Sequence, residues 1–533
     1  MPIDQPFDIL IVGGGAAGLA AAIFTARRWP VAPLISNNAH APRPTIAVLE
    51  GAKKPGAKIL VSGGGRCNVT NVRVLPDDFW GGSRNTIRCI LNAFPAEKTA
   101  DFFRELGVPL HEEEIGKLFP DTNNAHTVLN ALLHEADRLG VRLLSDHRVI
   151  DIAHDEQGFV LTVTHGWKYQ LAPHECGPGT LAEVDHVAPA PLPVCGTGNL
   201  PVSSDRPRNE CGTGFQPVPS VRPRYECSTD NLSRSSENSR KVCGTGFQPV
   251  LPSAQTAITP QQNDLPLFLR ARSVVLATGG LSLPKTGSDG HGYQLAQKLG
   301  HSLIPTTPGL APLILYGCFH TELSGVSHDV QITIAVRDEK PIRLRGAMLW
   351  THFGVSGPVA LDASRHWERA RLEGRDVRVT ASFLPDCDFA AADRRLLELG
   401  AAHPKRQLHN ALSALIPARV ADALLTRLEI AHGIPMTHLP KDLRLRLVHA
   451  LIEFPLPVRG TRGYAHAEVT AGGVPISEIN PATLESRLCP GLFLVGEILD
   501  VDGRIGGFNF QWAWSTAFVA GEGLSQRLCP KPV

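Results

Sequence analysis

The stretch FDILIVGGGAAGLAAAIFTARR near the N-terminus combines residue types and spacing that suit phosphate binding. An apolar run from Ile9 to Val12 leads into Gly13, Gly15 and Gly18, which stand at the spacing GxGxxG and precede an alanine-rich segment. This order predicts a strand, a tight turn and a helix. Gly13 permits the turn, Gly15 lets a pyrophosphate approach the backbone, and Gly18 lets the helix pack closely on the strand.

A carboxylate at the end of the next strand would complete a nucleotide site. The run TIAVLE ends in Glu50, which could accept hydrogen bonds from a ribose diol. The usual separation from the last glycine is about 20 residues, and here it is longer by roughly the length of an insert from Pro30 to Pro44. The alternative interpretation of Glu50 is a solvated carboxylate at a strand end.

Three other segments also lead into glycines. VSGGGRCNVTN, Val61 to Asn71, has three successive glycines, which cost backbone entropy and contribute no packing, so a ligand close to the main chain explains them better than a core. SVVLATGG, Ser273 to Gly280, and the C-terminal LFLVGEILDVDGRIGGFNFQWAW each begin with an apolar run that predicts a strand. Since ligands of doubly wound sheets bind at the carboxyl ends of strands, one extended ligand such as FAD could touch all four segments.

The composition favours a globular protein of two or three domains with a small-molecule substrate. Among 533 residues, 52 Lys and Arg nearly balance 51 Asp and Glu, so no electrostatic footprint for nucleic acid or an anionic membrane is visible. The uncharged run from Ile9 to Ala26 belongs to the glycine motif rather than to a signal peptide, and we expect a cytoplasmic protein. The eleven cysteines show no CxxC and no metal-ligand spacing, so we expect no disulfide framework and no metal site.

A change of composition divides the chain. Between residues 174 and 262, Pro, Gly, Ser, Thr and Arg dominate, and Cys195, Cys211, Cys227 and Cys243 recur every sixteen residues. We expect a disordered duplication there; a cysteine-based metal or partner-binding array is the alternative. The predicted parts are a first FAD-domain segment (1–173), the repeat insertion (174–262), a second FAD-domain segment (263–308), an insert domain covering the flavin (309–457) and a C-terminal FAD-domain segment (458–533).

Several motifs together resemble those of the BaiN-like flavoproteins, also called the YhiN or aminoacetone-oxidase-like family. They are GGGAAG, KILVSGGGRCNVTN, TGSDGHGYQLAQKLGH, THFGVSGP, AHAEVTAGGV and GEILDVDGRIGGFNFQWAW. The resemblance covers nearly all of the chain except the two inserts. It implies an α/β fold: a glutathione-reductase-type FAD-binding Rossmann domain built from both chain ends, with an insert domain that is part β-barrel and part helical.

The resemblance also implies a set of cofactor contacts. It places Gly13, Gly15, Ala16, Ala17 and Gly18 at the pyrophosphate, Glu50 at the adenosine ribose and Val149 at the adenine through its backbone. Along the phosphates and flavin it places Lys58, Ser62, Gly63, Gly64, Gly65, Arg66, Cys67 and Asn68. Thr278 and Gly279 would close the cradle, and the ribityl chain and ring would be surrounded by Gly496, Glu497, Asp502, Gly506, Gly507, Phe508 and Asn509.

The predicted activity is that of an FAD-dependent oxidoreductase acting on a small organic substrate, with NAD(P)H as a candidate electron donor. Arg66, His352 and Glu497 are candidates for the general acid, and the sequence does not choose among them. Cys67 could be a redox or flavin-linking thiol, or it could simply line the flavin site. The alternatives are a flavin-binding redox sensor or scaffold without turnover, and a tRNA-modifying flavoprotein, which the missing basic excess disfavours. The oligomeric state is not predicted.

Overall fold

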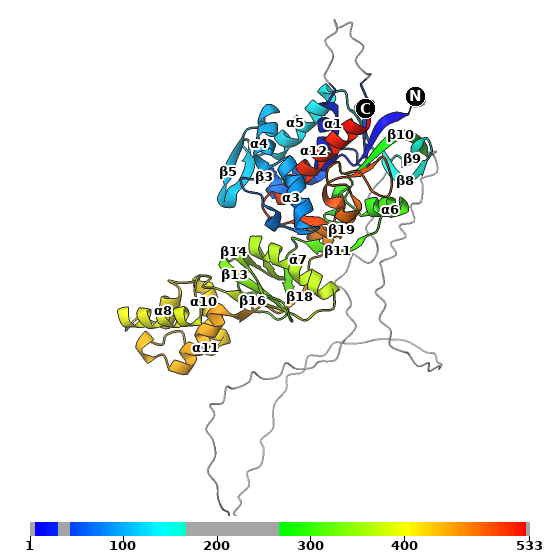
Figure 1. Cartoon of the computed structure of the whole chain (residues 1–533). Helices are drawn as coiled ribbons and strands as arrows, with labels where there is room; N and C mark the ends of the chain where they lie inside the picture. The colour runs from blue at the N-terminus through cyan, green and yellow to red at the C-terminus, as the bar shows by residue number, and fades with distance from the viewer. Residues whose placement is uncertain (1–5, 30–42, 167–265, 529–533) are drawn as a thin grey trace, which may run out of the picture. The chain divides into compact units, whose positions relative to one another are not determined.

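The computed structural model of the chain describes residues 6–29, 43–166 and 266–528. The described residues all belong to the first of the two units into which the chain divides, which takes in residues 1–170 and 260–533. The sixteen-residue repeat and most of the insert between Pro30 and Pro44 lie outside the described residues. The predictions made for those two segments therefore stay predictions, and the fold below is that of the first unit (Figure 1).

A seven-stranded sheet with a parallel centre forms the larger domain in the described part of the chain. Its strands run in the order β7-β2-β1-β10-β9-β8, with β20 pairing the second half of β10. The strands are β1 (Phe7–Val12), β2 (Ile46–Glu50), β7 (Arg142–Ser145), β8 (Arg148–Asp155), β9 (Gly158–Thr164), β10 (Leu267–Leu276) and β20 (Leu492–Leu494). Because β7, β2, β1, β10 and β20 are parallel, their carboxyl ends share one edge, where a nucleotide binds in doubly wound sheets.

The N-terminal and C-terminal helices pack against each other. Helix α1 (Ala16–Ala26) is buried along almost its whole length, and α12 (Phe508–Leu528) lies beside it (Figure 1). Small residues allow this close approach, because a Cβ on Gly521 would lie 2.9 Å from the Cβ of Phe24. The alanine-rich composition of α1 thus reflects helix packing, and both chain ends build one domain, as the sequence predicts.

Smaller elements surround the sheet edge. The short strands pair as β3-β6-β5, β21-β4 and β11-β19. Their bounds are β3 (Thr70–Asn71), β4 (Phe79–Gly81), β5 (Leu110–Glu113), β6 (Lys117–Pro120), β11 (Ile304–Gly309), β19 (Val469–Gly473) and β21 (Val501–Gly503). The helices are α2 (Ala57–Val61), α3 (Arg84–Ala93), α4 (Ala96–Glu105), α5 (Ala125–Arg138) and α6 (His291–Lys298).

The insert domain consists of an antiparallel sheet with helices. Its strand order is β17-β16-β13-β14-β15-β12-β18. The strands are β12 (Leu313–Leu315), β13 (Ser327–Val336), β14 (Ile342–Thr351), β15 (Gly354–Ser356), β16 (Val377–Ser382), β17 (Phe454–Pro455) and β18 (Val458–Thr461). Only Leu456 and Pro457 separate the two edge strands in the chain, so the sheet curls until its edges approach each other, as in a partly closed barrel. Strand β18 lies just beyond the expected boundary at residue 457.

Helices complete the insert domain. Helix α7 (Pro358–Leu372) packs on β13 and β14, and the others are α8 (Phe389–Ala402), α9 (Leu408–Leu412), α10 (Ala418–Arg427) and α11 (Lys441–Ile452). The domain has a hydrophobic core of its own, separate from the core of the sheet domain. Two packed domains are therefore present among the described residues.

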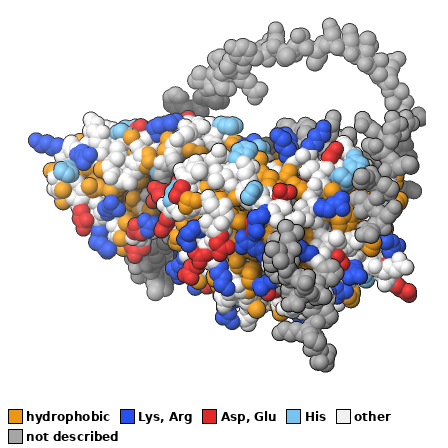
Figure 2. All heavy atoms as spheres, turned by 90° about the horizontal axis from the view of Figure 1, so that it is seen from above, with side chains coloured by type: hydrophobic (Ala, Val, Ile, Leu, Met, Phe, Trp, Pro, Cys, Tyr) orange, Lys and Arg blue, Asp and Glu red, His pale blue; other side chains and the backbone are white. Residues whose placement is uncertain are grey.

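The surface carries charges of both signs. Figure 2 shows acidic and basic side chains interspersed on one face of the molecule, in keeping with a net charge of +1. None of the helices in the described ranges is long and apolar enough to cross a bilayer.

Candidate functional site

The three glycines of the first turn have three different reasons to be glycine. Gly13 has a φ of +110°, and a Cβ there would lie 2.4 Å from the Ala277 carbonyl oxygen. A Cβ on Gly18 would lie 1.9 Å from the carbonyl oxygen of Gly13, so helix α1 could not pack on β1. At Gly15, in contrast, a Cβ would meet nothing within 4 Å. Gly13 and Gly18 are therefore required by the fold, whereas Gly15 keeps the backbone open on the side where Ala16 and Ala17 begin the helix.

Glu50 lies at the end of β2 beside this turn, as the sequence predicts. Its Oε2 accepts a hydrogen bond from the Gly14 nitrogen at 2.9 Å, and its Oε1 accepts one from the Ala52 nitrogen at 2.8 Å. Burial raises the pKa of the Glu50 carboxyl, and the two N–H donors and Arg148 oppose the rise. The carboxylate is thus held in place by main chain and is not a freely solvated group.

Val149 and the start of α6 lie at the same edge of the sheet as Glu50. Val149 is buried in β8, which starts next to the end of β2. Arg148 donates from Nη2 to both Asp289 oxygens at 2.8 Å, and Asp289 accepts from the His291 nitrogen at the start of α6. Close by, the buried hydroxyl of Ser288 has no hydrogen-bond partner in the structure, and it lies 2.5 Å from where a Cβ on Gly279 would be.

The run from Ser62 to Asn68 turns through left-handed backbone. Gly63, Gly64 and Gly65 have φ values of +55°, +68° and +85°, and Cys67 has +64°. A Cβ on Gly64 would meet nothing within 4 Å, and the three glycines are exposed. They are glycine because of their conformation, and they leave the main chain open to a ligand.

The side chains of Cys67 and Arg66 are both held by protein contacts inside this loop. Cys67 is fully buried in the hydrophobic core, and burial raises the pKa of its thiol to about 12, so a reactive thiolate is disfavoured. The Arg66 guanidinium binds Glu113 at 2.5 Å and lies 4.1 Å from the centre of the Phe119 ring. Arg66 therefore fastens the loop to β5 and β6.

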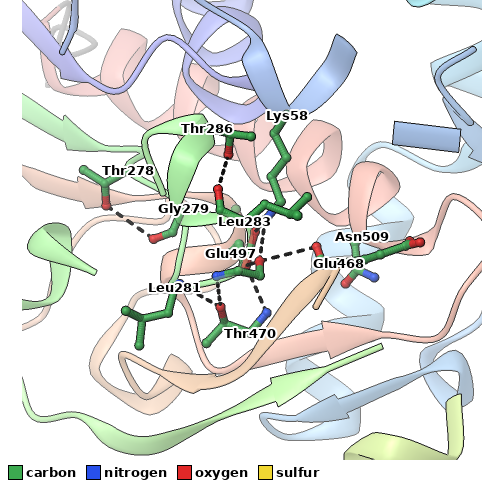
Figure 3. Close-up of polar contacts among 12 residues, drawn as sticks. Lys58, Thr278, Gly279, Leu281, Leu283, Thr286, Glu468, Thr470, Glu497 and Asn509 are labelled. Carbon is green, nitrogen blue, oxygen red and sulfur yellow. Dashed lines mark hydrogen bonds and ion pairs between the residues drawn. The ribbon is translucent and has the colours of Figure 1, made fainter. Parts of the chain in front are cut away.

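Glu497 connects four segments of the domain (Figure 3). Its Oε2 binds Lys58 Nζ at 2.5 Å, and its Oε1 accepts from the Ser282 hydroxyl at 2.6 Å and from the Thr470 nitrogen at 3.0 Å. Lys58 Nζ also donates to Ser282 Oγ at 2.6 Å. Both oxygens of Glu497 are thus occupied, which favours an anchoring role over proton donation. Gly496 adopts a φ of +75° just before it, where a Cβ would lie 2.8 Å from that of Ala17.

The start of α12 docks onto the loop that follows the glycine run. Gly507 has a φ of +92°, and a Cβ there would lie 2.5 Å from the Thr70 carbonyl carbon and oxygen. When the Asn68 amide is oriented to donate to the Thr70 carbonyl, its oxygen accepts from the Gly507 nitrogen at 3.0 Å. Asn68 and Gly507 thus bond to each other. Gly506, with a φ of +122°, has its carbonyl bonded by the Asn71 amide at 3.2 Å.

Three residues of this last motif have side chains that bond or pack within the protein. Asp502 is 1% exposed, and Arg365 of the insert domain binds both of its oxygens, at 2.5 and 3.0 Å. The Asn509 amide accepts from the Gly503 nitrogen and donates to the Gly503 carbonyl. The Phe508 ring is buried against Phe79, with Arg504 above it. These side chains hold the loop in place, and their expected contact with the ribityl chain and ring stays a prediction.

The three remaining expected residues lie in two different places. Thr278 and Gly279 follow β10 at the same sheet edge, and Gly279 has a φ of +71°. His352 is exposed in the turn between β14 and β15, where its ring packs on Phe353. Within the described residues, no hydrogen bond or ion pair joins His352 to the glycine-rich strand ends, which gives it no support as the acid.

Sequence reasoning missed four charged residues near the start of α12. Asp362 on α7 accepts from the Ile505 nitrogen at 2.8 Å. Burial raises the pKa of its carboxyl and Glu468 adds to the rise, whereas Arg504 and Lys117 lower the pKa. Burial of the Glu468 carboxyl raises its pKa, although the residue as a whole is accessible to solvent. No sequence motif marks these residues, because they come together only in the folded chain.

The open face at Gly15, the unpartnered Ser288 hydroxyl, Glu50 at the end of β2 and the exposed glycine run fit an extended dinucleotide. A parallel sheet with these features, built from both chain ends, defines an FAD-binding Rossmann domain of the glutathione-reductase type. Glu50 would hold the ribose, the turn at Gly15 the pyrophosphate, and the run from Gly63 to Gly65 the more distal part of the cofactor.

Comparison with known families identifies the group within this class. Residues 7–172 and 253–523 match the model of the HI0933-like protein Rossmann domain. The chain belongs to this family of FAD-dependent oxidoreductases, and the resemblance to the BaiN-like flavoproteins is confirmed.

Curated relatives match over the whole length. The ribosomal RNA dihydrouridine synthase of Escherichia coli K12 is 28% identical, with 98% of each chain covered. The 3-dehydro-bile acid delta(4,6)-reductase of Clostridium scindens is 26% identical, covering 97% of this chain and 98% of the relative. The ribosomal RNA dihydrouridine synthase of Haemophilus influenzae is also 26% identical, covering 98% of this chain and 100% of the relative.

Proposed function

We propose that this protein is an FAD-dependent reductase of a carbon–carbon double bond conjugated to a carbonyl group. The observation that carries the proposal is the full-length match to relatives whose names describe one type of chemistry on different substrates. A dihydrouridine synthase saturates a bond of the uracil ring next to a carbonyl, and a delta(4,6)-reductase of a 3-dehydro compound saturates bonds conjugated to a ketone. An activated alkene is the structure common to both.

The proposed net reaction transfers two electrons and two hydrogens. A hydride adds to the carbon β to the carbonyl, a proton adds to the α carbon, and a reduced nicotinamide, NADH or NADPH, is oxidised. FAD, when bound, supplies the hydride chemistry. The protein's own contribution is to hold the cofactor along Gly15, Glu50 and the run from Gly63 to Gly65, and to provide the proton.

The favoured substrate is a small unsaturated carbonyl compound. The net charge of +1 and the interspersed surface charges (Figure 2) lack the excess of Lys and Arg that phosphate-backbone binding uses. A second candidate is uridine in ribosomal RNA, which is supported by the names of two relatives. A redox sensor without turnover is the alternative outside the enzymes.

The test separates the two half-reactions under anaerobic conditions. The purified protein is reduced with NADH or NADPH and then mixed with 2-cyclohexenone, a 3-oxo-Δ4 steroid, or ribosomal RNA prepared without modifications. The proposal predicts that one acceptor class reoxidises the flavin and yields a product heavier by two hydrogens. Protein stripped of FAD is the matched control. Reoxidation by oxygen alone would contradict the proposal and favour an oxidase or a sensor.

A further inference from the structure

Two carboxylates near the start of α12 have no assigned role. Asp362 projects from α7 of the insert domain, and Glu468 precedes β19 of the FAD domain. Within the described residues, neither carboxylate forms an ion pair, whereas Glu497 and Asp502 nearby are each bound by a cation. A carboxylate without a cationic partner is the kind that can hold a proton near neutral pH.

Asp362 is positioned by the loop that leads into Gly506. Its Oδ1 accepts from the Ile505 nitrogen at 2.8 Å, and no hydrogen bond is formed by its Oδ2 among the described groups. Arg365, three residues further along α7, donates two hydrogen bonds to Asp502 of the same loop. Residues three apart lie on one face of a helix, so Arg365 fixes the face of α7 from which Asp362 reaches the loop.

The charges facing Asp362 come from three separate elements. Arg504 precedes Gly506, Lys117 begins β6, and Glu468 lies before β19. Arg504 is engaged elsewhere, since its Nε donates to Asp78 at 2.7 Å. Burial raises the pKa of Glu468, and the charges of Lys58 and Lys117 lower it. Asp362 therefore belongs to a polar cluster formed by both domains beside Gly506 and Gly507, the residues expected from the sequence to lie near the flavin ring.

We propose that Asp362 is the residue that donates the proton to the α carbon of the substrate. This inference rests on the proposed function. When hydride adds at the β carbon, the electron pair of the double bond moves to the α carbon and its carbonyl. The Asp362 carboxyl releases its proton to that carbon and becomes a carboxylate, which then regains a proton from water.

The protonation state of Asp362 supports this assignment. Burial raises its pKa to about 7, against the smaller opposing effects of the Ile505 hydrogen bond and Arg504. A general acid works best with a pKa near the operating pH. The three acids considered from the sequence are less suitable, because Arg66 and Glu497 are held in ion pairs and His352 is exposed in a turn of the insert domain.

The test compares wild type with Asp362→Asn, which keeps an oxygen to accept from Ile505. The variant is expected to bind FAD and to be reduced by NAD(P)H at the wild-type rate. Reoxidation by the alkene should slow by about 10²- to 10⁴-fold and lose its decline above about pH 7. Reoxidation by ferricyanide, which needs no proton on carbon, should stay unchanged. Glu368→Gln on the same helix is the matched control and should behave like wild type.

A second measurement does not depend on turnover. In wild-type protein labelled with 13C at aspartate carboxyls, NMR should show one carboxyl titrating near pH 7, and Asp362→Asn should lack that signal. If no aspartate titrates between about pH 6 and about pH 8, the inference is overturned even if the variant does not fold. Alkene reduction by Asp362→Asn at the wild-type rate overturns the inference and leaves the proposed function intact. Wild-type protein that no alkene reoxidises overturns the proposed function and with it the proton donor.

Discussion

Replacing Arg365 by methionine should destabilise the protein strongly, because it leaves Asp502 as a buried carboxylate without its partner. The Asp502 residue is 1% exposed, the Arg365 side chain is 13% exposed, and two hydrogen bonds join them. Breaking such a buried pair by removing one partner typically costs about 3–5 kcal/mol. Methionine keeps most of the apolar stem of arginine, so lost packing contributes little.

The loss should depend on pH in a defined direction. Burial raises the pKa of Asp502, and Arg365 lowers it, so Arg365→Met moves it further up. A carboxyl with a raised folded-state pKa contributes stability that is present below its unfolded pKa, about 3.9, and is lost as the pH rises through the folded pKa. The difference in unfolding free energy between wild type and Arg365→Met should therefore be largest at high pH and shrink as acid protonates Asp502 in both proteins.

Urea unfolding monitored by tryptophan fluorescence, at several pH values, measures this difference. Arg371→Met, on the exposed part of the same helix, is the control and should change the free energy by less than about 0.5 kcal/mol. The double variant Arg365→Met with Asp502→Asn should recover part of the loss, since the buried charge is then absent. A loss below about 1 kcal/mol for Arg365→Met, without pH dependence, would refute the buried ion pair as the link between α7 and β21.

Three further results are expected. Iodoacetamide should label Cys89 in the native protein and spare Cys67, as read by peptide mapping, because burial raises the pKa of Cys67 to about 12; rapid labelling of Cys67 would show an accessible thiolate. Gly507→Ala should lower the melting temperature far more than Gly64→Ala, because its Cβ would meet the Thr70 backbone whereas that of Gly64 would meet nothing; equal shifts would argue against this packing. His352→Ala should leave both half-reactions within about twofold of wild type, and a selective loss of alkene reduction would return His352 to the site.

The sequence predicts well those parts of the site that depend on local geometry. The turn from Gly13 to Gly18 and the strand ending in Glu50 follow from glycine spacing and apolar runs. The exposed glycines after Ser62 follow from the absence of side chains where the backbone must turn. In each case the physical requirement lies within a few residues of the motif.

Roles set by distant partners could not be predicted in this way. Asp502 and Glu497 stand in one motif, but their partners Arg365 and Lys58 lie 137 and 439 residues away. The environment of Asp362 depends on Ile505, 143 residues further along the chain, so neither composition nor spacing marks it. A resemblance between motifs indicates the family without showing what each side chain contacts.

The measurement that tests the central claim most directly is the FAD content of wild type and Gly15→Val. Because a Cβ at Gly15 meets no protein atom, the variant should fold with a wild-type circular dichroism spectrum and fail to retain FAD, while acid should release about one FAD per chain from wild type. Gly18→Val, whose Cβ would overlap the Gly13 carbonyl oxygen, should fail to fold and shows that the two glycines act differently. A folded wild-type protein that takes up no added FAD, or a Gly15→Val protein that keeps a full complement, would contradict the assignment of this sheet edge as the cofactor site.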